Sequence, residues 1–384
     1  MVPMGQIICV VGTRPEVIKM APVVLALKEA GHDARILATA QHRHLLDQML
    51  RVFDLAPDWD LDAMRPNQGL PDLTGTLVPA LDRVFRAAGP DLVLAQGDTA
   101  TVLCAALAAF YARIPFGHVE AGLRSGDLAA PFPEEGNRRL VSQVADLHFA
   151  PTERARQALL REGIDPAGVH QVGNTVIDAL LQTAGRADLA WPAEVPTPAP
   201  GSRLVLVTLH RRENFGAPLE RILATLRNLA VAHPELQLVY PVHPNPNVLE
   251  PARRVLGRTP GVTLCEPLDY PALVALLKAS WAVFTDSGGL QEEAPALGKP
   301  VLVFREVTER PEAVEAGSVR LVGSDPLAIH HEVERLRTDP AHHAAMSVPR
   351  FPYGDGRSGR RIARIIGAFL ESRRGRTTVP THSI

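Results

Sequence analysis

The sequence alternates between short apolar runs and longer amphipathic segments, and this alternation constrains the fold more than any other feature. Runs such as IICVVG at 7–12 lead directly into segments with the apolar spacing of a helix. Strands that alternate with helices form βαβ units, and successive units build a parallel sheet. The runs expected to be strands lie at 7–12, 34–39, 91–97, 114–120, 147–151, 169–174, 204–210, 236–243, 262–267, 282–286 and 300–304.

A segment rich in proline and alanine, at 187–203, interrupts this alternation and shows no periodicity. The pattern then restarts, which in a chain of 384 residues predicts two Rossmann-like α/β domains. The last helical pattern is expected to pack back on the first domain, and the tail after it to be flexible. The expected boundaries are 1–181 for the N-terminal domain, 182–203 for the linker, 204–356 for the C-terminal domain, 357–373 for the last helix and 374–384 for the tail.

The charge balance excludes several classes of partner. A net charge of -2 and a pI near 6.7 give no reason to expect binding to nucleic acid or to an anionic membrane. No segment is long and apolar enough to span a bilayer, and the N-terminal apolar run is too short for a signal peptide. The three cysteines lie in apolar runs without metal-ligand spacing, as expected for reduced thiols. These features predict a cytoplasmic protein.

Polar clusters follow the ends of most expected strands. In open α/β sheets, ligands bind beyond the carboxyl ends of the strands, so these clusters are candidates for a site. If the two sheets face each other, their strand ends would line one cleft. The clusters are Gly12–Arg14, Gln96–Asp98, Glu120, His210–Glu213, His243 and Asp286–Gly289.

The stretch TDSGGLQEEAPALGKPVLVF, at 285–304, is the most specific of these. Ser287, Gly288 and Gly289 open a helix after a strand, where free backbone N–H groups and the helix dipole favour a phosphate. Glu293 follows one to two turns later, where its carboxylate could accept hydrogen bonds from ribose hydroxyls. A serine N-cap before flexible glycines would look similar, but Glu293 and the strand-end position favour a nucleotide site.

The first expected βα turn, VVGTRPEVIKMAP at 10–22, contains a single glycine. It therefore lacks both the dinucleotide fingerprint GxGxxG and the P-loop GxxxxGK[ST], which argues against an NAD cofactor. Arg14 and Lys19 instead place two cations near a helix start, where they could neutralise a diphosphate. Arg310 follows a later strand end, and its local context favours an ion pair with a nearby glutamate over a phosphate contact.

Two histidines, His210 and His243, each follow a strand end. Neither has a second ligand at fixed spacing, so no metal site is expected there. His210 lies between an apolar strand and an arginine-rich loop, where it is a candidate acid, base or phosphate donor. The histidine pairs at 330–331 and 342–343 lie in polar, helix-like stretches and are expected at the surface.

The stretch GHVEAGLRSGDLAAPFPEEGNRR, at 117–139, follows a buried strand but has neither helical nor strand periodicity. A diphosphate held by cations and a helix N-terminus implies an activated leaving group. Glu120 and Glu134 from this stretch, with Asp98 from the preceding strand end, are then candidates for proton transfer.

Together these stretches resemble the bacterial non-hydrolysing UDP-N-acetylglucosamine 2-epimerases, from about residue 7 to residue 370. The resemblance rests on many motifs in one order. These include GTRPEVIKMAP, TAQHR, GDT, GHVEAGLRSGDLAAPFPEEGNR, FAPTE, GNTVIDAL, HRREN, YPVHPNP, TDSGGLQEEAP and TERPEAVEAG.

The resemblance implies a GT-B fold, with two Rossmann-like domains whose parallel sheets face a central cleft, in a homodimer. It implies interconversion of UDP-GlcNAc and UDP-ManNAc for cell-surface polysaccharide biosynthesis, without NAD, metal or other cofactor. UDP would leave C1 as the C2 proton is removed, giving 2-acetamidoglucal, and would then add back with protonation on the opposite face of C2.

The resemblance also assigns roles by motif. The residues that match catalytic positions are Asp98, Glu120, Glu134 and His210. Those that match UDP-binding positions are Arg14, Lys19, Ser287, Gly288, Gly289, Glu293 and Arg310. Near the uracil, this chain has Leu268 where some members have glutamine and Leu273 where some have an aromatic residue. These two changes predict that the base is contacted mostly through backbone groups.

Members of the family are understood to bind a second UDP-GlcNAc, which activates the enzyme. The residues that match this second site are Gln41, His44, Asn67, Glu134, Arg211 and His243. Related sequences can carry glutamine at the position of His44 and arginine at that of Asn67. The loss of an arginine removes a charge-assisted contact, so we expect weaker activation than in relatives.

Three other functions fit parts of this pattern. A hydrolysing epimerase would release ManNAc and UDP, but such relatives differ around the 117–139 stretch. A GT-B glycosyltransferase would need an acceptor site, which the sequence does not reveal. A catalytically silent nucleotide-sugar sensor would not need all four candidate catalytic residues.

Overall fold

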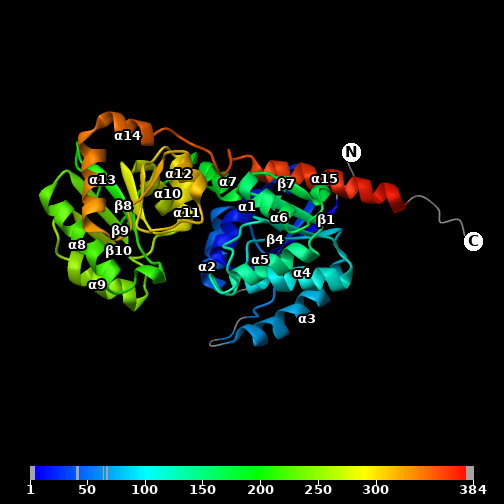
Figure 1. Cartoon of the computed structure of the whole chain (residues 1–384). Coiled ribbons are helices and arrows are strands. Elements are labelled where there is room, and N and C mark those ends of the chain that lie inside the picture. The colour runs from blue at the N-terminus through cyan, green and yellow to red at the C-terminus, as the bar shows by residue number, and fades with distance from the viewer. Residues whose placement is uncertain (1–4, 40–42, 64, 66–67, 378–384) are drawn as a thin grey trace, which may run out of the picture. The chain divides into compact units, whose positions relative to one another are not determined.

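The computed structural model describes residues 5–39, 43–63, 65 and 68–377, and the chain divides into two compact units. Unit 1 comprises Met1–Ala179 and Tyr353–Ile384, and unit 2 comprises Leu180–Pro352. Each unit is a Rossmann-like α/β unit built on one parallel sheet (Figure 1). The expected fold class, with two such units, is confirmed.

Unit 1 contains a sheet of seven parallel strands in the order β3-β2-β1-β4-β5-β6-β7. Its strands are β1 Gln6–Val11, β2 Asp33–Ala38, β3 Trp59–Asp60, β4 Leu92–Gln96, β5 Phe116–Val119, β6 Leu147–Ala150 and β7 Val169–Gln171. Its helices are α1 Arg14–Glu29, α2 Arg43–Val52, α3 Leu70–Ala88, α4 Ala100–Ala112, α5 Glu134–Val144, α6 Glu153–Arg161 and α15 Ser358–Thr377, and α7 Thr175–Ala184 leads into unit 2.

Unit 2 contains six parallel strands in the order β10-β9-β8-β11-β12-β13. Its strands are β8 Arg203–Thr208, β9 Leu236–Pro241, β10 Val262–Cys265, β11 Ala282–Thr285, β12 Val301–Val303 and β13 Val319–Leu321. Its helices are α8 Ala217–Ala232, α9 Pro246–Leu256, α10 Tyr270–Ala279, α11 Gly288–Ala296, α12 Pro311–Glu315, α13 Pro326–Thr338 and α14 Pro340–Met346.

The central strands are apolar on both faces because helices cover both faces of a parallel sheet. In β1, every residue after Gln6 is buried, and β4 is buried throughout. In unit 2, the core joins β8, β9 and β11 to the buried faces of α8, α9 and α13. The short apolar runs of the sequence are therefore the middles of the two sheets.

The strand order of each sheet reverses at one point, and this point locates the candidate site. In unit 1 the connections diverge between β1 and β4, and in unit 2 between β8 and β11. Ligands of open α/β sheets bind beyond the carboxyl ends of the strands at such a switch point. The loops that begin at Gly12, Gly97, Leu209 and Asp286 leave these four strands at that edge.

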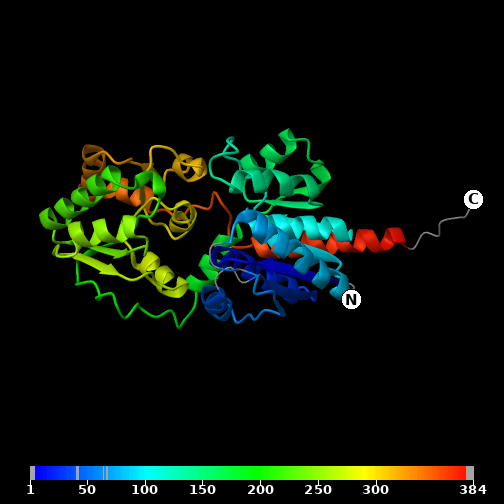
Figure 2. The same cartoon turned by 90° about the horizontal axis from the view of Figure 1, so that it is seen from below.

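The chain returns to unit 1 at its end. Helix α15 packs along α1, and Figures 1 and 2 show it, in red, in the same body as the N-terminal strands. The apolar residues Ile362, Ile366 and Leu370 of α15 are buried. The helix extends to Thr377, so residues 374–377, expected as part of the tail, are helical.

Two strands were not expected from the sequence, β3 and β13. Both are edge strands of two or three residues, too short for a periodic pattern. Within the described part of the chain, no helix combines the length and the apolar character needed to cross a membrane.

Candidate active site

In unit 1, the first loop of the site is held by Glu16, a buried residue in the first turn of α1. Its carboxylate accepts hydrogen bonds from the N–H groups of Gly12 and Thr13, at 2.5 and 2.9 Å, and from the Thr99 hydroxyl at 2.6 Å. Burial is the largest influence and raises the pKa of Glu16 to about 6. Glu16 thus ties the loop after β1 to the start of α4 after β4.

Glu120 follows β5 directly, and its side chain is 6% exposed. One carboxylate oxygen, Oε2, lies 2.5 Å from Nζ of Lys19 and also accepts a hydrogen bond from the Gln96 amide. The backbone of Glu120 is left-handed, with φ of 64°, a conformation that non-glycine residues adopt rarely and often at functional sites. Two of the sequence-predicted residues, Lys19 and Glu120, are therefore in direct contact.

Asp98 lies two residues beyond the end of β4 and contacts helix α5. Its Oδ2 is 2.6 Å from Nη2 of Arg138, and its carbonyl accepts a hydrogen bond from the Asn137 amide at 2.8 Å. Glu134 lies one turn earlier on α5, and its Oε2 is buried without a hydrogen-bond partner among the described residues. The end of β4 and the start of α5 thus bring Asp98 and a partly buried carboxylate to the same edge of the sheet.

The irregular stretch between β5 and α5 is fixed by a buried carboxylate, that of Glu135. It accepts a hydrogen bond from the Ser125 N–H at 3.0 Å and pairs with Arg138 and Arg139. Burial alone would raise the pKa of Glu135, but these hydrogen bonds and charges hold it below its usual value. The carboxylate of Glu135 therefore has a structural role in holding this loop, and not every carboxylate of the stretch is a candidate for proton transfer.

Gly122 in the same stretch lets the chain turn close to α6. Its φ is 88°, and a Cβ at this position would lie 2.2 Å from the Ala155 carbonyl oxygen. Only glycine fits a backbone of this conformation at so short a distance. The chain therefore turns two residues after Glu120, which stays at the carboxyl end of β5.

In unit 2, the loop after β8 is organised by Asp286, whose side chain is fully buried. Its carboxylate accepts hydrogen bonds from the N–H groups of His210 and Arg211, at 3.0 and 2.9 Å, and from the Asn214 amide at 3.0 Å. The strand expected at 204–210 ends at Thr208, and the N–H groups of His210 and Arg211 bond to this side chain and not to a neighbouring strand.

His210 is 39% exposed at the end of this loop, and its Nδ1 lies 3.5 Å from Oδ1 of Asp286. Its ring stacks on that of His243, with centroids 5.9 Å apart. Partial burial lowers the pKa of His210, and the charges of Arg211 and His243 lower it further, while Asp286 acts in the opposite direction. A lowered pKa favours the neutral imidazole, which has both a donor and an acceptor nitrogen.

Helix α11 begins where the sequence predicts a phosphate site. Ser287 is its N-cap, and Gly288 and Gly289 form its first turn. A Cβ at Gly289 would meet no atom closer than 3.6 Å, so this turn is open. Glu293 is buried one turn later, and its Oε1 accepts a hydrogen bond from the Tyr270 hydroxyl at 3.2 Å.

Arg310 pairs with Glu292, a buried residue of α11 that the sequence analysis did not single out. Nearby, Arg211 Nη2 lies 3.4 Å from Oε1 of Glu309. A Cβ at Gly288 would lie 3.2 Å from both of these atoms. Arginine side chains therefore lie beside the start and along the length of α11.

The two residues expected near the base lie on adjacent elements. Leu268 is in the loop after β10, and Leu273 is in the first turn of α10, both half-buried. Arg14 is the first residue of α1 in unit 1 and is also half-buried.

The residues predicted for a second nucleotide-sugar site are only partly described. Gln41 and Asn67 lie outside the described residues, and His44 lies in α2, without a described side chain. Arg211 and His243 lie in unit 2, next to His210.

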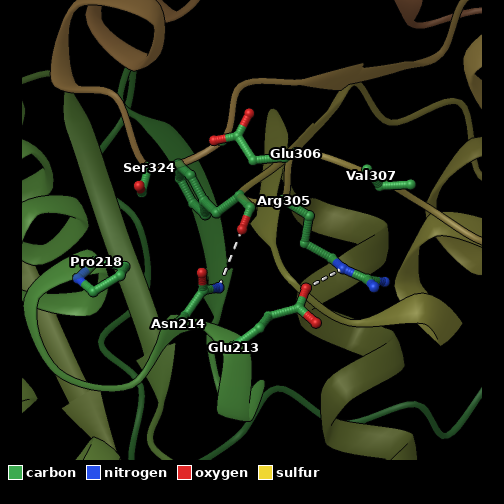
Figure 3. Close-up of a pocket in the computed structure, with 9 residues that line it drawn as sticks. Glu213, Asn214, Pro218, Arg305, Glu306, Val307 and Ser324 are labelled. Carbon is green, nitrogen blue, oxygen red and sulfur yellow. Dashed lines mark hydrogen bonds and ion pairs between the residues drawn. The ribbon is translucent and has the colours of Figure 1, made fainter. Parts of the chain in front are cut away.

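A pocket of about 370 Å³ opens beside the His210 loop, lined by Glu213, Asn214, Pro218, Phe304, Arg305, Glu306, Val307, Gly323 and Ser324 (Figure 3). Its arginine, Arg305, pairs with Glu213 at 2.5 Å and with Glu309 at 2.6 Å. None of the sequence-predicted catalytic or UDP-binding residues lines this pocket.

Several residues that hold the site were missed from the sequence. One of them, Glu16, had a readable signal, because Thr-x-x-Glu at a helix start is a capping-box pattern. Arg138 and Glu292 had none, because their partners are distant in the sequence or carry no local pattern.

Comparison with known proteins identifies relatives over nearly the whole chain. The family model described as UDP-N-acetylglucosamine 2-epimerase matches residues 25–367. The UDP-N-acetylglucosamine 2-epimerase of Escherichia coli is 50% identical, with 96% of this chain and 99% of that protein aligned.

Solved structures agree with the sequence comparison. The Neisseria meningitidis UDP-GlcNAc 2-epimerase, bound to UDP-GlcNAc, has a TM-score of 0.85 and 42% identity over 94% of this chain and 99% of its own. The S. aureus protein MnaA, in a structure with UDP, has a TM-score of 0.87 and 42% identity over 96% and 97% of the two chains. The fold is that of the GT-B epimerases, and this chain belongs to the UDP-N-acetylglucosamine 2-epimerase family.

Proposed function

We propose that this protein interconverts UDP-GlcNAc and UDP-ManNAc by elimination and re-addition of UDP. The observation that carries the proposal is the grouping of acid–base side chains at the switch point of unit 1, in a chain half identical to a named UDP-N-acetylglucosamine 2-epimerase. The phosphate-type helix start of unit 2 supports it, since a helix N-terminus of this kind can bind the diphosphate of a nucleotide sugar.

Inversion at C2 requires a proton to leave one face of the sugar ring and another to arrive on the opposite face. In the proposed reaction, a base removes the C2 proton, the C2–H electron pair forms the C1–C2 double bond, and the C1–O bond breaks to release UDP. UDP then adds back to C1 of 2-acetamidoglucal as C2 is protonated from the other side. No net oxidation occurs, so the proposed reaction has no need of NAD.

In unit 1, we assign proton transfer to Glu120, Glu134 and Asp98. The Lys19 ammonium contacts the Glu120 carboxylate and fixes its position at the end of β5. Glu134 has one buried oxygen without a hydrogen-bond partner among the described residues, which leaves it available to a substrate proton. More than one such group is needed, because the two faces of the ring cannot be served from one position.

In unit 2, we assign the nucleotide to the start of α11. The N–H groups of Gly288 and Gly289 and the hydroxyl of Ser287 would bind the diphosphate, and Arg310 would add a positive charge. The carboxylate of Glu293 would accept hydrogen bonds from the ribose. His210 would donate its N–H to a phosphate oxygen or to the sugar as the C1–O bond breaks.

The mechanism predicts that solvent deuterium enters C2 of both nucleotide sugars. Proton NMR in D2O should show that the signal of the hydrogen on C2 disappears from UDP-GlcNAc and UDP-ManNAc as they equilibrate. The reason is that the removed proton exchanges with solvent before C2 is protonated again. The Glu120→Gln variant is the matched control, because any deuterium that enters C2 at the same rate in this variant does not depend on the proposed base.

Other products would contradict specific steps. Epimerisation with the C2 proton retained would exclude proton transfer as proposed. Free ManNAc with UDP as the main products would identify a hydrolysing enzyme, because the intermediate would then be captured by water and not by UDP.

The assignment of unit 2 predicts that Arg310→Ala weakens UDP binding by about tenfold or more, the value of a charge-assisted hydrogen bond. Calorimetric titration with UDP measures this directly. Arg254→Ala removes an exposed arginine of the same unit and should leave UDP affinity unchanged.

Loss of Arg310 also leaves Glu292 buried without this partner. The double variant Arg310→Ala/Glu292→Gln removes that buried charge, so it separates a loss of affinity from a loss of folding. Wild-type affinity for UDP in a folded double variant would contradict the role of Arg310.

Assembly as a homodimer, activation by a second UDP-GlcNAc and a cytoplasmic location follow from the family resemblance or from composition, and remain predictions. Sedimentation velocity tests the first, and the lag in the reaction from UDP-ManNAc, with and without a trace of UDP-GlcNAc, tests the second.

A further inference from the structure

Outside the candidate active site, three metal-ligating side chains converge on the surface of unit 2. They are His233, His330 and Glu334, and their ligand atoms all lie within 4.8 Å of one another. Nε2 of His233 is already 2.7 Å from Oε1 of Glu334. Two imidazole nitrogens and one carboxylate oxygen form a ligand set that suits zinc.

The backbone holds these three side chains together. His330 and Glu334 are four residues apart on α13, so they lie on the same face of that helix. His233 is the C-cap of α8, and its carbonyl accepts a hydrogen bond from the Leu236 N–H at 2.9 Å. Helices α8 and α13 lie side by side, packed through the apolar core of unit 2. The ligands therefore come from two elements whose relative position is fixed.

A further contact orients the carboxylate. Arg337 holds both oxygens of Glu334, since its Nη2 donates to Oε2 at 2.8 Å and its Nε donates to Oε1 at 3.2 Å, and Oε1 also faces His233. The positive charge of Arg337 is shared with Glu235, whose Oε1 is 3.3 Å away. Partners of this kind, which fix the orientation of a ligating carboxylate, are typical of metal sites.

We propose that His233, His330 and Glu334 bind one Zn²⁺ ion that links α8 to α13. The ion replaces the His233–Glu334 hydrogen bond with two metal–ligand bonds and adds a third from His330. Since His330 is exposed, water completes the tetrahedral shell.

The site lies at the amino-terminal edge of the sheet, away from the proposed chemistry. Arg203, the first residue of β8, donates its N–H to the Glu235 carbonyl at 2.7 Å and a side-chain hydrogen bond to the Arg337 carbonyl at 3.1 Å. His210 and Ser287 follow the carboxyl ends of β8 and β11, at the opposite edge. The ion therefore stabilises unit 2 and takes no part in epimerisation.

Calorimetric titration of the full-length protein with ZnCl₂ tests the proposal, with MgCl₂ as a control ion that prefers oxygen ligands. We expect one tight Zn²⁺ per chain and no tight Mg²⁺. His330→Ala should weaken Zn²⁺ binding by roughly 100-fold or more, because it removes one of three ligands. His331→Ala removes the neighbouring exposed histidine and retains every proposed ligand, so it should bind Zn²⁺ like the wild type.

Thermal unfolding gives an independent readout. Zn²⁺ should raise the Tm of the wild type and of His331→Ala but not that of His330→Ala, since a ligand bound only by the folded state stabilises it. Epimerase turnover should be the same in all three proteins. Equal Zn²⁺ affinity in wild type and His330→Ala, or an equal loss in both variants, would overturn the proposal.

Discussion

Replacing Glu120 by glutamine is expected to lower kcat by roughly 100-fold or more while UDP affinity changes by no more than about threefold. Glutamine keeps the size of the side chain but cannot accept a proton from C2. The Gln96 and Lys19 contacts around position 120 belong to unit 1, whereas most of the proposed nucleotide contacts, those at the start of α11 and at Arg310, belong to unit 2. Steady-state kinetics and calorimetric titration with UDP measure the two effects separately.

The control for this substitution is Glu153→Gln, which changes an exposed glutamate of α6 in the same unit and should leave kcat unaltered. Glu120→Gln also removes the negative partner of Lys19, so its Tm should be compared with that of the wild type. Activity within a few-fold of wild type in a folded Glu120→Gln protein would show that this carboxylate does not transfer the proton.

The second large effect is expected at Asp286. Replacing it by alanine should lower the free energy of unfolding by about 3 kcal/mol or more and abolish most activity. The reason is that three donors, the N–H groups of His210 and Arg211 and the amide of Asn214, lose their common acceptor in a buried position. Urea unfolding and kcat measure the two consequences.

Asp286→Asn is the matched variant, since it keeps the volume and one acceptor oxygen but removes the charge. We expect it to lie between wild type and Asp286→Ala in both measurements. If Asp286→Ala retained wild-type kcat, the position of His210 would not depend on this carboxylate, and the loop after β8 would be held by other contacts.

The sequence predicted the sheets well because their strands are short continuous apolar runs, a pattern that buried parallel strands require. It placed β1, β4, β8 and β11 at the right positions, and with them the four loops at the switch points. It missed β3 and β13, edge strands of two and three residues, although β7, an edge strand of three residues, lies within the expected run at 169–174.

The candidate site was predictable as a set of positions but not as a set of contacts. Strand ends and the SGG helix start are local features, and the sequence identifies them directly. The pairing of Lys19 with Glu120 joins residues 101 apart, and that of Asp98 with Arg138 joins residues 40 apart. Such pairs depend on which strands are neighbours and how far each loop extends, which only the folded chain determines.

The return of α15 to unit 1 has a consequence for synthesis on the ribosome. Unit 2 is one continuous segment, Leu180–Pro352, inserted between two parts of unit 1. At ordinary translation rates its synthesis takes on the order of 10 to 30 s, and α15 emerges only afterwards. During this interval the face of α1 that α15 will cover stays open to solvent. Unit 2 can therefore complete its fold first, and the unit that begins the chain is the last to be finished.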